Sequence, residues 1–492
     1  PGRLLLAGLA TLSLALLAGL TLRSPPPAAA PLCQGAELAL ASVWSPQRRA
    51  AIATRFTTTG PRYAGATWQT TAAALDQFAA TWTDAHTRVC SATRIYGHQS
   101  EAELTRRMRC LDDQRADLQQ TVDLLARAEP DLVERAVTIA YGLPDPATCI
   151  TRAGDDPTDR DDPGVRHVRD RIAEAATLVR AARYADARAL LGDALAVAAS
   201  RGWHPLVADG QTILAEALDQ LGEPAAAEEA LYRAVWAATA ARDDARDARA
   251  WTRMAPLVAE KLARPAEAHR ALEHARAALT RLGPDPTLAA DTRASEAAVA
   301  IADGNFTAAR DTLAAALAAS PLPADDPRRI KPTSNYGVSF YMLGDHLAAA
   351  DQYRRALAIA EPRLGRDHPE VGNLVNNLGN ALLALDDLDA AETQQRRALQ
   401  IFRDALGEAH PSTAGALANL ANIAVLRGQP TQAVSRYQEV LAILTAGGRT
   451  HPDEARVAYN LGATFIAKPW QPGELLRVAS SLFARAQPQR TS

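Results

Sequence analysis

Aromatic residues are scarce in this chain. They make up 5% of its 492 residues, while alanine and leucine supply most of the 48% that is hydrophobic. Many small side chains and few rings favour closely packed helices over β-sandwiches, which are built from Val, Ile and aromatic residues. A strong charge of one sign is also lacking, and a formal net charge of −3 provides no basic field for nucleic acid. The composition therefore predicts an all-α protein without a nucleic-acid partner.

Lysine is nearly absent as well, and Lys261, Lys331 and Lys468 are its only occurrences. This leaves few candidates for a catalytic lysine. No Ser/His/Asp or Cys/His arrangement has a spacing that supports nucleophilic catalysis. No group of Cys and His has the spacing of a zinc site. We therefore predict no catalytic residue, no metal and no cofactor.

One long stretch near the N-terminus has no charge. It covers the nineteen residues 4–22, LLLAGLATLSLALLAGLTL, between Arg3 and Arg23. At the helical rise this length spans about 30 Å, the hydrocarbon thickness of a bilayer. It predicts a transmembrane helix or signal anchor over 1–23 and a Pro/Ala spacer over 24–32, with a cleaved secretory signal as the alternative. The expected localisation is a single-pass membrane protein whose bulk is extracytoplasmic, on the periplasmic side.

Cysteine occurs four times, at Cys33, Cys90, Cys110 and Cys149. After a membrane segment, such cysteines are expected to form disulfides. Of the three possible pairings we favour the nested one, Cys90 with Cys110 and Cys33 with Cys149; four buried free thiols are the alternative. Apolar residues between the cysteines recur near the helical period. Residues 33–150 are therefore predicted to form a small disulfide-linked helical domain.

Repeated sequence follows an acidic, Pro-containing linker over 151–163 and extends over 164–470. A small residue recurs every 40 to 42 residues, after a turn such as GNFTAA or GDHLAA and before a helical segment such as QYRRAL. This is the signature of tetratricopeptide (TPR) repeats, whose helix pairs stack into a right-handed superhelical α-solenoid. The small residues of the seven clear repeats are Ala187, Ala227, Ala268, Ala309, Ala349, Ala391 and Ala433.

The end of the array is less regular. An eighth repeat begins at Ala455, but prolines within 468–472 interrupt its second helix, and residues 471–492 are predicted to be a cap helix and tail. The long period resembles the kinesin light chain type of TPR repeat, which has a His-Pro pair at a helix start. The pairs beginning at His368, His410 and His451 fit this pattern. Because each lies in a different repeat, we interpret them as structural helix starts and not as metal ligands.

Asparagine recurs in the last four repeats, one residue before the Leu-Gly position. TPR arrays bind peptides along the inner face, which the first helix of each repeat lines. The resemblance implies that these amides hydrogen-bond the backbone of a bound peptide, since an amide offers both a donor and an acceptor. The alternative is a consensus asparagine that bonds within the solenoid. The predicted peptide-groove residues are Asn335, Asn377, Asn419 and Asn460, with Asn376, Asn380 and Asn422 on the same face.

The region before the repeats carries a series of short motifs. They are Cys33, Val43-Trp44, Gly60 to Tyr63, Trp68, Leu75 to Phe78, Trp82, Cys90 to Thr93, Arg107 to Gln114 and Leu143 to Cys149. This order resembles the extracytoplasmic region of a class of large bacterial transmembrane serine/threonine protein kinases. In that class a cytoplasmic kinase domain and one membrane helix precede such a Cys-containing segment and TPR repeats. This sequence has no Gly-rich phosphate loop, HRD-type loop or DFG motif, so it is predicted not to be an enzyme.

These observations predict a non-catalytic protein- or peptide-binding sensor or scaffold, membrane-anchored through residues 4–22, as the extracytoplasmic part of a signalling receptor. Signal transfer through a homodimer is one hypothesis. The alternative is the tail of a serine/threonine protein kinase whose catalytic domain lies upstream. A secreted scaffold with the first segment cleaved is a third hypothesis.

Overall fold

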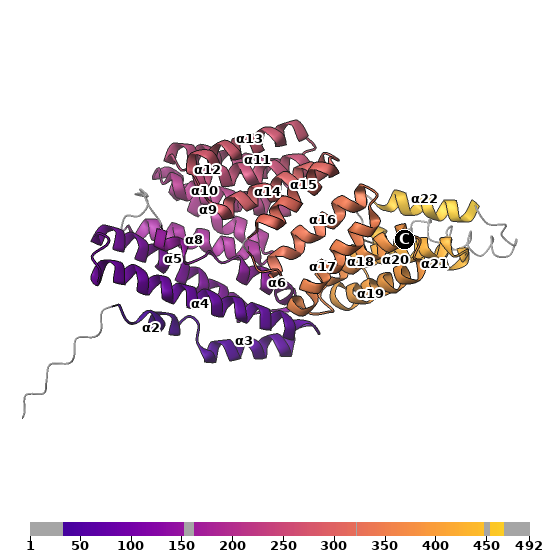
Figure 1. Ribbon diagram of the computed structural model, residues 1–492, viewed down its shortest axis with the longest axis horizontal. Coiled ribbons are helices and arrows are strands. Elements are labelled where there is room, and N and C mark those ends of the chain that lie inside the picture. Colours follow the sequence, from indigo (N-terminus) through magenta and orange to yellow (C-terminus); the bar gives the residue numbers. More distant parts are fainter. Residues whose placement is uncertain (1–32, 152–161, 321, 447–452, 467–492) are drawn as a thin grey trace, which may run out of the picture. The chain divides into compact units, whose positions relative to one another are not determined.

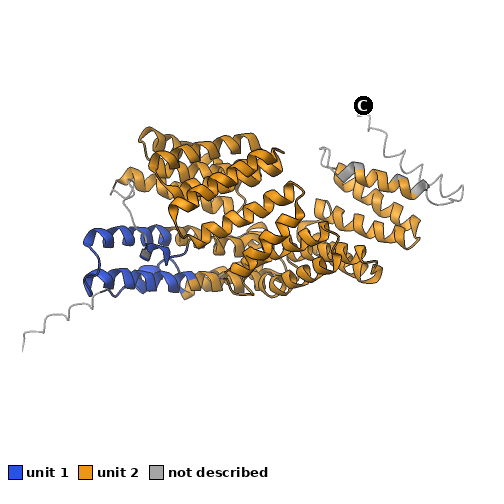
Figure 2. Cartoon of the chain, turned by 45° about the horizontal axis from the view of Figure 1, so that its top comes forward, with its two compact units in different colours: residues 1–45, 78–115, 145–153 blue, residues 46–77, 116–144, 154–492 orange. Residues whose placement is uncertain are grey.

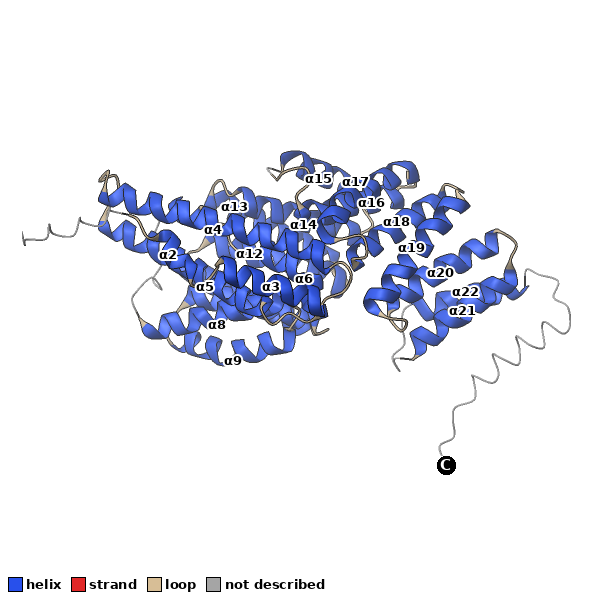
Figure 3. Cartoon of the chain, turned by 90° about the horizontal axis from the view of Figure 1, so that it is seen from below, coloured by secondary structure: helices blue, strands red, loops and turns tan. Residues whose placement is uncertain are grey.

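The computed structural model describes residues 33–151, 162–320, 322–446 and 453–466. Every regular element in these residues is helical, as Figure 3 shows, which confirms the predicted all-α class. The elements are α2 (Ala36–Ala41), α3 (Pro46–Thr59), α4 (Ala64–Arg94), α5 (Glu101–Leu125), α6 (Pro130–Tyr141), α7 (Thr148–Thr151), α8 (Pro163–Arg180), α9 (Tyr184–Ser200), α10 (His204–Gln220), α11 (Pro224–Ala241), α12 (Asp244–Pro256), the π-helical turn η1 (Leu257–Lys261), α13 (Pro265–Leu282), α14 (Pro286–Ala302), α15 (Phe306–Ala319), the 3-10 turn η2 (Pro327–Arg329), α16 (Ile330–Met342), α17 (His346–Leu364), α18 (Pro369–Ala384), α19 (Leu388–Leu406), α20 (Pro411–Leu426), α21 (Pro430–Thr445) and α22 (Asp453–Ile466).

The chain divides into two compact units, coloured separately in Figure 2. Unit 1 takes in residues 1–45, 78–115 and 145–153, and unit 2 takes in residues 46–77, 116–144 and 154–492. The segments 46–77 and 116–144 thus group with the repeats, although the sequence predicted one domain over 33–150. The domain boundaries derived from the sequence stay a prediction.

Unit 1 is held by two disulfides. Cys33, just before α2, is bonded to Cys90 of α4, with the Cα atoms 5.5 Å apart. Cys110 of α5 is bonded to Cys149 of α7, with the Cα atoms 5.7 Å apart. Trp82 of α4 is almost completely buried in the same unit. All four cysteines are therefore used in disulfides, as predicted, and none is a free thiol.

The pairing predicted for these cysteines is wrong. Cys90 does not bond to Cys110, nor Cys33 to Cys149. The reason is the register of α4 and α5. Trp82 Nε1 donates a hydrogen bond to the Leu111 carbonyl at 2.7 Å, which places Cys110 alongside Trp82. Cys90 lies about two helical turns further along α4, beyond the reach of a disulfide.

Unit 2 contains the repeats, and their helices follow one another side by side in Figure 1. Seven helix pairs run from α8–α9 to α20–α21, and α22 is the first helix of an eighth repeat. The small residue of each repeat lies on the second helix of its pair and has no exposed surface, which confirms its predicted place at a helix contact. These residues are Ala187, Ala227, Ala268, Ala309, Ala349, Ala391 and Ala433. The spacer over 24–32, linker residues 152–161 and the end of the array from residue 467 lie outside the described residues.

The His-Pro pairs begin helices, as predicted. His368 and His410 are the N-caps of α18 and α20. The Nδ1 atom of each imidazole accepts a hydrogen bond from a backbone N–H two residues later, that of Glu370 or Ser412, at 3.1 Å. The proline that follows each histidine occupies the first helical position, where a missing N–H costs no hydrogen bond. His451 lies outside the described residues.

His368 also makes a bond that joins α18 to α6. Its Nε2 atom donates to the Glu134 carbonyl at 3.0 Å. Because Nδ1 accepts and Nε2 donates, the imidazole is neutral and carries its proton on Nε2. The side chain is buried, and this burial lowers the pKa of His368 to about 4, although the Glu134 carbonyl opposes the shift.

Helix α4 contacts the end of α17, just before His368. The Thr67 hydroxyl donates to the Leu364 carbonyl at 2.9 Å, and the Thr70 hydroxyl donates to the preceding carbonyl at 2.6 Å. Gly365 has a φ of +99°, and a Cβ there would lie 2.8 Å from the Cβ of Tyr63. Glycine is therefore required both by the backbone conformation and by the space available.

No helix in the described residues is both long enough and apolar enough to cross a membrane. This finding corrects two predictions, the transmembrane helix in the fold class and the single-pass membrane localisation. Both rested on residues 4–22, which lie outside the described residues. An apolar run of that length is a sign that membrane helices and secretory signals share. The fold class that the structure supports is an all-helical repeat solenoid with helices preceding it.

We expect the Cys110–Cys149 disulfide to contribute substantially to the stability of unit 1. Replacing both cysteines by serine should lower the free energy of local unfolding by about 3 to 4 kcal/mol, because the bond restricts an unfolded loop that closes across a sequence separation of 39. Hydrogen exchange of the amides of α5 within 101–115 measures this. Titration of four thiols in the denatured, unreduced wild-type protein would contradict both disulfides.

Unit 2 should lose stability in mild acid because of His368. Above the ordinary histidine pKa of about 6.5, both folded and unfolded chains hold this side chain neutral. Below it, the unfolded chain takes up a proton that the folded chain refuses until about pH 4. Stability therefore falls as the pH decreases between these values, by about 3 kcal/mol in total.

Urea unfolding at pH 7.5 and pH 4.5 measures this loss. His368→Asn keeps a capping side chain but removes the titrating group, so the loss should shrink. His410→Asn is the comparison variant, because it replaces the same type of cap where α6 is not bonded. Burial lowers the pKa of His410 too, but less than that of His368, so this variant should shrink the loss less than His368→Asn does. An equal pH dependence in wild type and His368→Asn would contradict the assignment.

Candidate functional site

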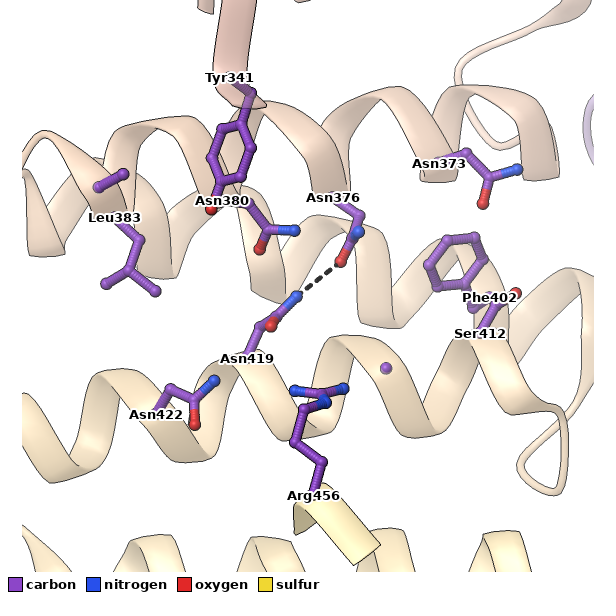
Figure 4. A pocket seen from close by; sticks show the side chains of 12 residues that line it. Tyr341, Asn373, Asn376, Asn380, Leu383, Phe402, Ser412, Asn419, Asn422 and Arg456 are labelled. Atoms are coloured by element: carbon purple, nitrogen blue, oxygen red, sulfur yellow. Dashed lines mark hydrogen bonds between the residues drawn. The ribbon is translucent and has the colours of Figure 1, made fainter. Parts of the chain in front are cut away.

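A cavity of about 530 Å³ lies along the first helices of the last repeats, in unit 2. Figure 4 shows that asparagines of α18 and α20 face one another across it. We call the cavity the asparagine groove. Its lining residues are Tyr341 of α16; Asn373, Asn376, Asn380, Leu383 and Ala384 of α18; Phe402 of α19; Ser412, Gly415, Asn419 and Asn422 of α20; and Arg456 of α22.

The helical period explains why these asparagines gather. Asn373, Asn376 and Asn380 are three and four residues apart in α18 and therefore lie on one face of that helix. Asn419 and Asn422 are three residues apart in α20 and likewise share one face of it. Because α18 and α20 are neighbours, the two faces border one groove.

Amide hydrogen bonds connect consecutive repeats across the groove. Asn419 Nδ2 donates to Asn376 Oδ1 at 3.0 Å, the dashed line in Figure 4. One repeat further, Asn460 Nδ2 is 3.4 Å from Asn422 Oδ1. These bonds make the amides part of the solenoid as well as part of the groove wall.

Two buried residues of the second helices support the asparagines from behind. Gln395 of α19 donates through Nε2 to the Asn376 carbonyl at 3.0 Å and to Asn380 Oδ1 at 2.9 Å. Tyr437 of α21 donates its hydroxyl proton to Asn422 Oδ1. Burial raises the pKa of Tyr437, so the phenol keeps the proton that it donates. Neither Gln395 nor Tyr437 was predicted from the sequence.

The structure brings together four of the seven predicted asparagines. Asn376, Asn380, Asn419 and Asn422 line the groove, whereas Asn335, Asn377 and Asn460 are not among its twelve lining residues. Asn460 still reaches the groove wall through its bond to Asn422. The prediction was based on the four asparagines one residue before the Leu-Gly position. Of these four, only Asn419 lines the groove.

Several lining residues were missed because their type changes from repeat to repeat. Asn373, Gly415 and Arg456 occupy equivalent positions, 42 and 41 residues apart, but share no chemistry. Tyr341 and Phe402 contribute rings from flanking helices. A signal did exist for the two residues behind the groove, because Gln395 and Tyr437 lie 42 residues apart, and Tyr353 precedes them at the same interval.

The groove is rich in neutral amides and holds one charged residue. Arg456 is the single charged side chain among the twelve lining residues, and no carboxylate is among them. In the described part of the chain, no three His, Cys, Asp or Glu side chains are grouped so as to hold a metal ion. The chemistry that the groove offers is hydrogen bonding to a ligand.

Comparison with known proteins agrees with the repeat pattern. Residues 328–404 and 370–446 match the family described as tetratricopeptide repeat, which confirms the predicted TPR repeats in this part of the chain. The match includes α16 to α20, which supply nearly all of the groove. No curated protein matches the chain.

Comparison with solved structures also finds similar chains. One is a putative kinesin light chain from Podospora anserina with nearly identical TPR-like repeats, at 20% identity over 42% of this chain and 98% of that chain, with a TM-score of 0.37. Another is BtubC (BKLC) from P. vanneervenii, at 23% identity over 46% and 94%, with a TM-score of 0.36. A third is a Rap protein complexed with competence and sporulation factor, at 12% identity over 74% and 98%, with a TM-score of 0.44.

Proposed function

We propose that the chain is a non-catalytic protein-binding module that holds an extended peptide segment in the asparagine groove. The observation that carries this proposal is the row of amides facing the groove from α18 and α20. An extended peptide exposes N–H and C=O groups at short intervals, and side-chain amides can pair with both. The groove is lined by residues of α16, α18, α19, α20 and α22, and a ligand that contacts several helices in turn is better supplied by an extended chain than by a compact molecule.

A role as a sensor in a signalling protein is the finer part of the proposal. It is supported by the resemblance of the segment from Cys33 to Cys149 to the non-catalytic region of a class of serine/threonine protein kinases. The second candidate, that the chain is the tail of such a kinase, rests on the same resemblance. Reading the gene upstream of the codon for Pro1 tests it, because a kinase reading frame would be found there.

Peptide binding can be tested without knowing the natural ligand. Peptides of twelve residues are selected from a random displayed library on the purified chain, and the strongest is labelled with fluorescein. Its affinity is then measured by anisotropy. We expect Asn376→Ala combined with Asn419→Ala to weaken binding about tenfold or more, because two hydrogen-bonding groups are lost.

The folding of this double variant should be unaffected. Asn376 and Asn419 bond to each other, and removing both partners leaves no unpaired group behind. Circular dichroism and the thermal midpoint check this. Asn377→Ala is the matched control, since Asn377 adjoins Asn376 in α18 but is not among the lining residues. Equal affinities of the wild type and the double variant would overturn peptide binding in this groove.

A further inference from the structure

The supporting layer behind the groove repeats with the array. Tyr353, Gln395 and Tyr437 lie 42 residues apart on the second helices α17, α19 and α21. All three are buried, at 2%, 0% and 2% exposure. Tyr353 and Gln395 pack against a glycine of the first helix. A Cβ on Gly337 would lie 2.7 Å from the Tyr353 ring, and one on Gly379 would lie 2.6 Å from Gln395 Nε2. Of the three, Gln395 and Tyr437 bond to groove asparagines, whereas the position that Tyr353 would serve is Val338, which has no amide.

Gln395 fixes the orientation of the Asn380 amide. A backbone carbonyl can only accept a hydrogen bond, so the end of Gln395 that meets the Asn376 carbonyl must be Nε2. The same Nε2 meets Asn380, which must therefore present Oδ1. The Asn380 oxygen is thus turned to the interior, and its NH₂ group remains for the groove.

This arrangement leaves an unsatisfied group in the interior. Gln395 has no exposed surface, and among the described residues its Oε1 atom has no hydrogen-bond partner. Buried polar atoms without partners are destabilising and uncommon. An apolar side chain of similar size would avoid the penalty at this position. Stability alone therefore does not account for glutamine here.

Tyr437 acts on Asn422 in the same way. Its hydroxyl donates to Asn422 Oδ1, and Asn460 Nδ2 lies 3.4 Å from the same oxygen. Asn376 likewise has its Oδ1 engaged, by Asn419. Three groove amides therefore have their oxygens occupied and their NH₂ groups left over, whereas Asn419, which donates, keeps its oxygen.

We infer that Gln395 and Tyr437 are positioning residues that turn the asparagine NH₂ groups into the groove, so that the groove selects a peptide segment rich in hydrogen-bond acceptors. Backbone carbonyls and the carboxylates of Asp and Glu are such acceptors. Arg456 is the single charged side chain among the twelve lining residues, and the absence of carboxylates among them disfavours basic segments. The inference rests on the proposed function, because it requires a peptide in this groove.

Tyr437→Phe tests the positioning role with the smallest change, the loss of one hydroxyl. It should weaken binding of the labelled, library-selected peptide about fivefold, since Asn422 is then held with its donors toward the groove only by the 3.4 Å contact from Asn460. Tyr353→Phe is the matched control two repeats earlier. The position equivalent to Asn422 in that repeat is Val338, which has no amide to orient. This variant should bind as the wild type does.

Gln395→Met separates positioning from a merely structural role. Methionine fills a similar volume but removes the donors to Asn376 and Asn380 together with the unpartnered oxygen. We expect weaker peptide binding with a thermal midpoint that is unchanged or higher. A structural residue would show the reverse, a lower midpoint with unchanged affinity, and that result would overturn the inference.

The remaining outcomes also decide between the two proposals. If the Asn376→Ala, Asn419→Ala variant loses binding while Tyr437→Phe and Gln395→Met bind as the wild type does, the inference is overturned and the proposed function stands. If none of the variants alters binding, both are overturned. Enrichment of Asp and Glu among the selected peptides is the expected specificity. Enrichment of Lys and Arg would overturn it.

Discussion

The close approach of paired helices is the constraint on which the repeat structure depends. An alanine without exposed surface occurs on the second helix of all seven complete pairs. On the first helix, Gly337 and Gly379 leave no room for a Cβ, because a side chain of the second helix fills that space. Small residues at both surfaces let the helices lie close together. The ring-poor, alanine-rich composition follows from this requirement.

The same close packing gives the groove its chemistry. Gln395 reaches Asn380 where Gly379 of the first helix has no side chain at the point of contact, and in the next repeat Tyr437 reaches Asn422. Side chains of the second helices therefore orient the asparagines that the first helices present to a ligand. In this array, recognition and packing use the same contacts, so a change in the interior at Gln395 alters the surface.

Much of the array could be predicted from the sequence, because packing constraints repeat at a fixed period. The seven alanines and the capping histidines His368 and His410 were found in this way. The cysteine pairing could not be predicted from a repeat period, because it depends on the register between α4 and α5. The hydrogen bond from Trp82 to the Leu111 carbonyl shows that register. The groove was predicted in part. Asn376 and Asn380 were named, but Arg456 was missed because its equivalents are Asn373 and Gly415.

A solenoid is ordinarily one-dimensional, since each repeat contacts only its neighbours and its ends can unravel independently. The hydrogen bond from Thr67 to Leu364 joins positions 297 residues apart, and that from His368 to Glu134 joins positions 234 residues apart. These bonds link α4 and α6, which precede the array, to α17 and α18. The repeats from α8–α9 to α14–α15 therefore lie between two parts of the chain that are bonded to each other. Bonds of this kind make neighbouring repeats fold cooperatively. They also add contacts between residues far apart in the sequence, and such contacts slow folding.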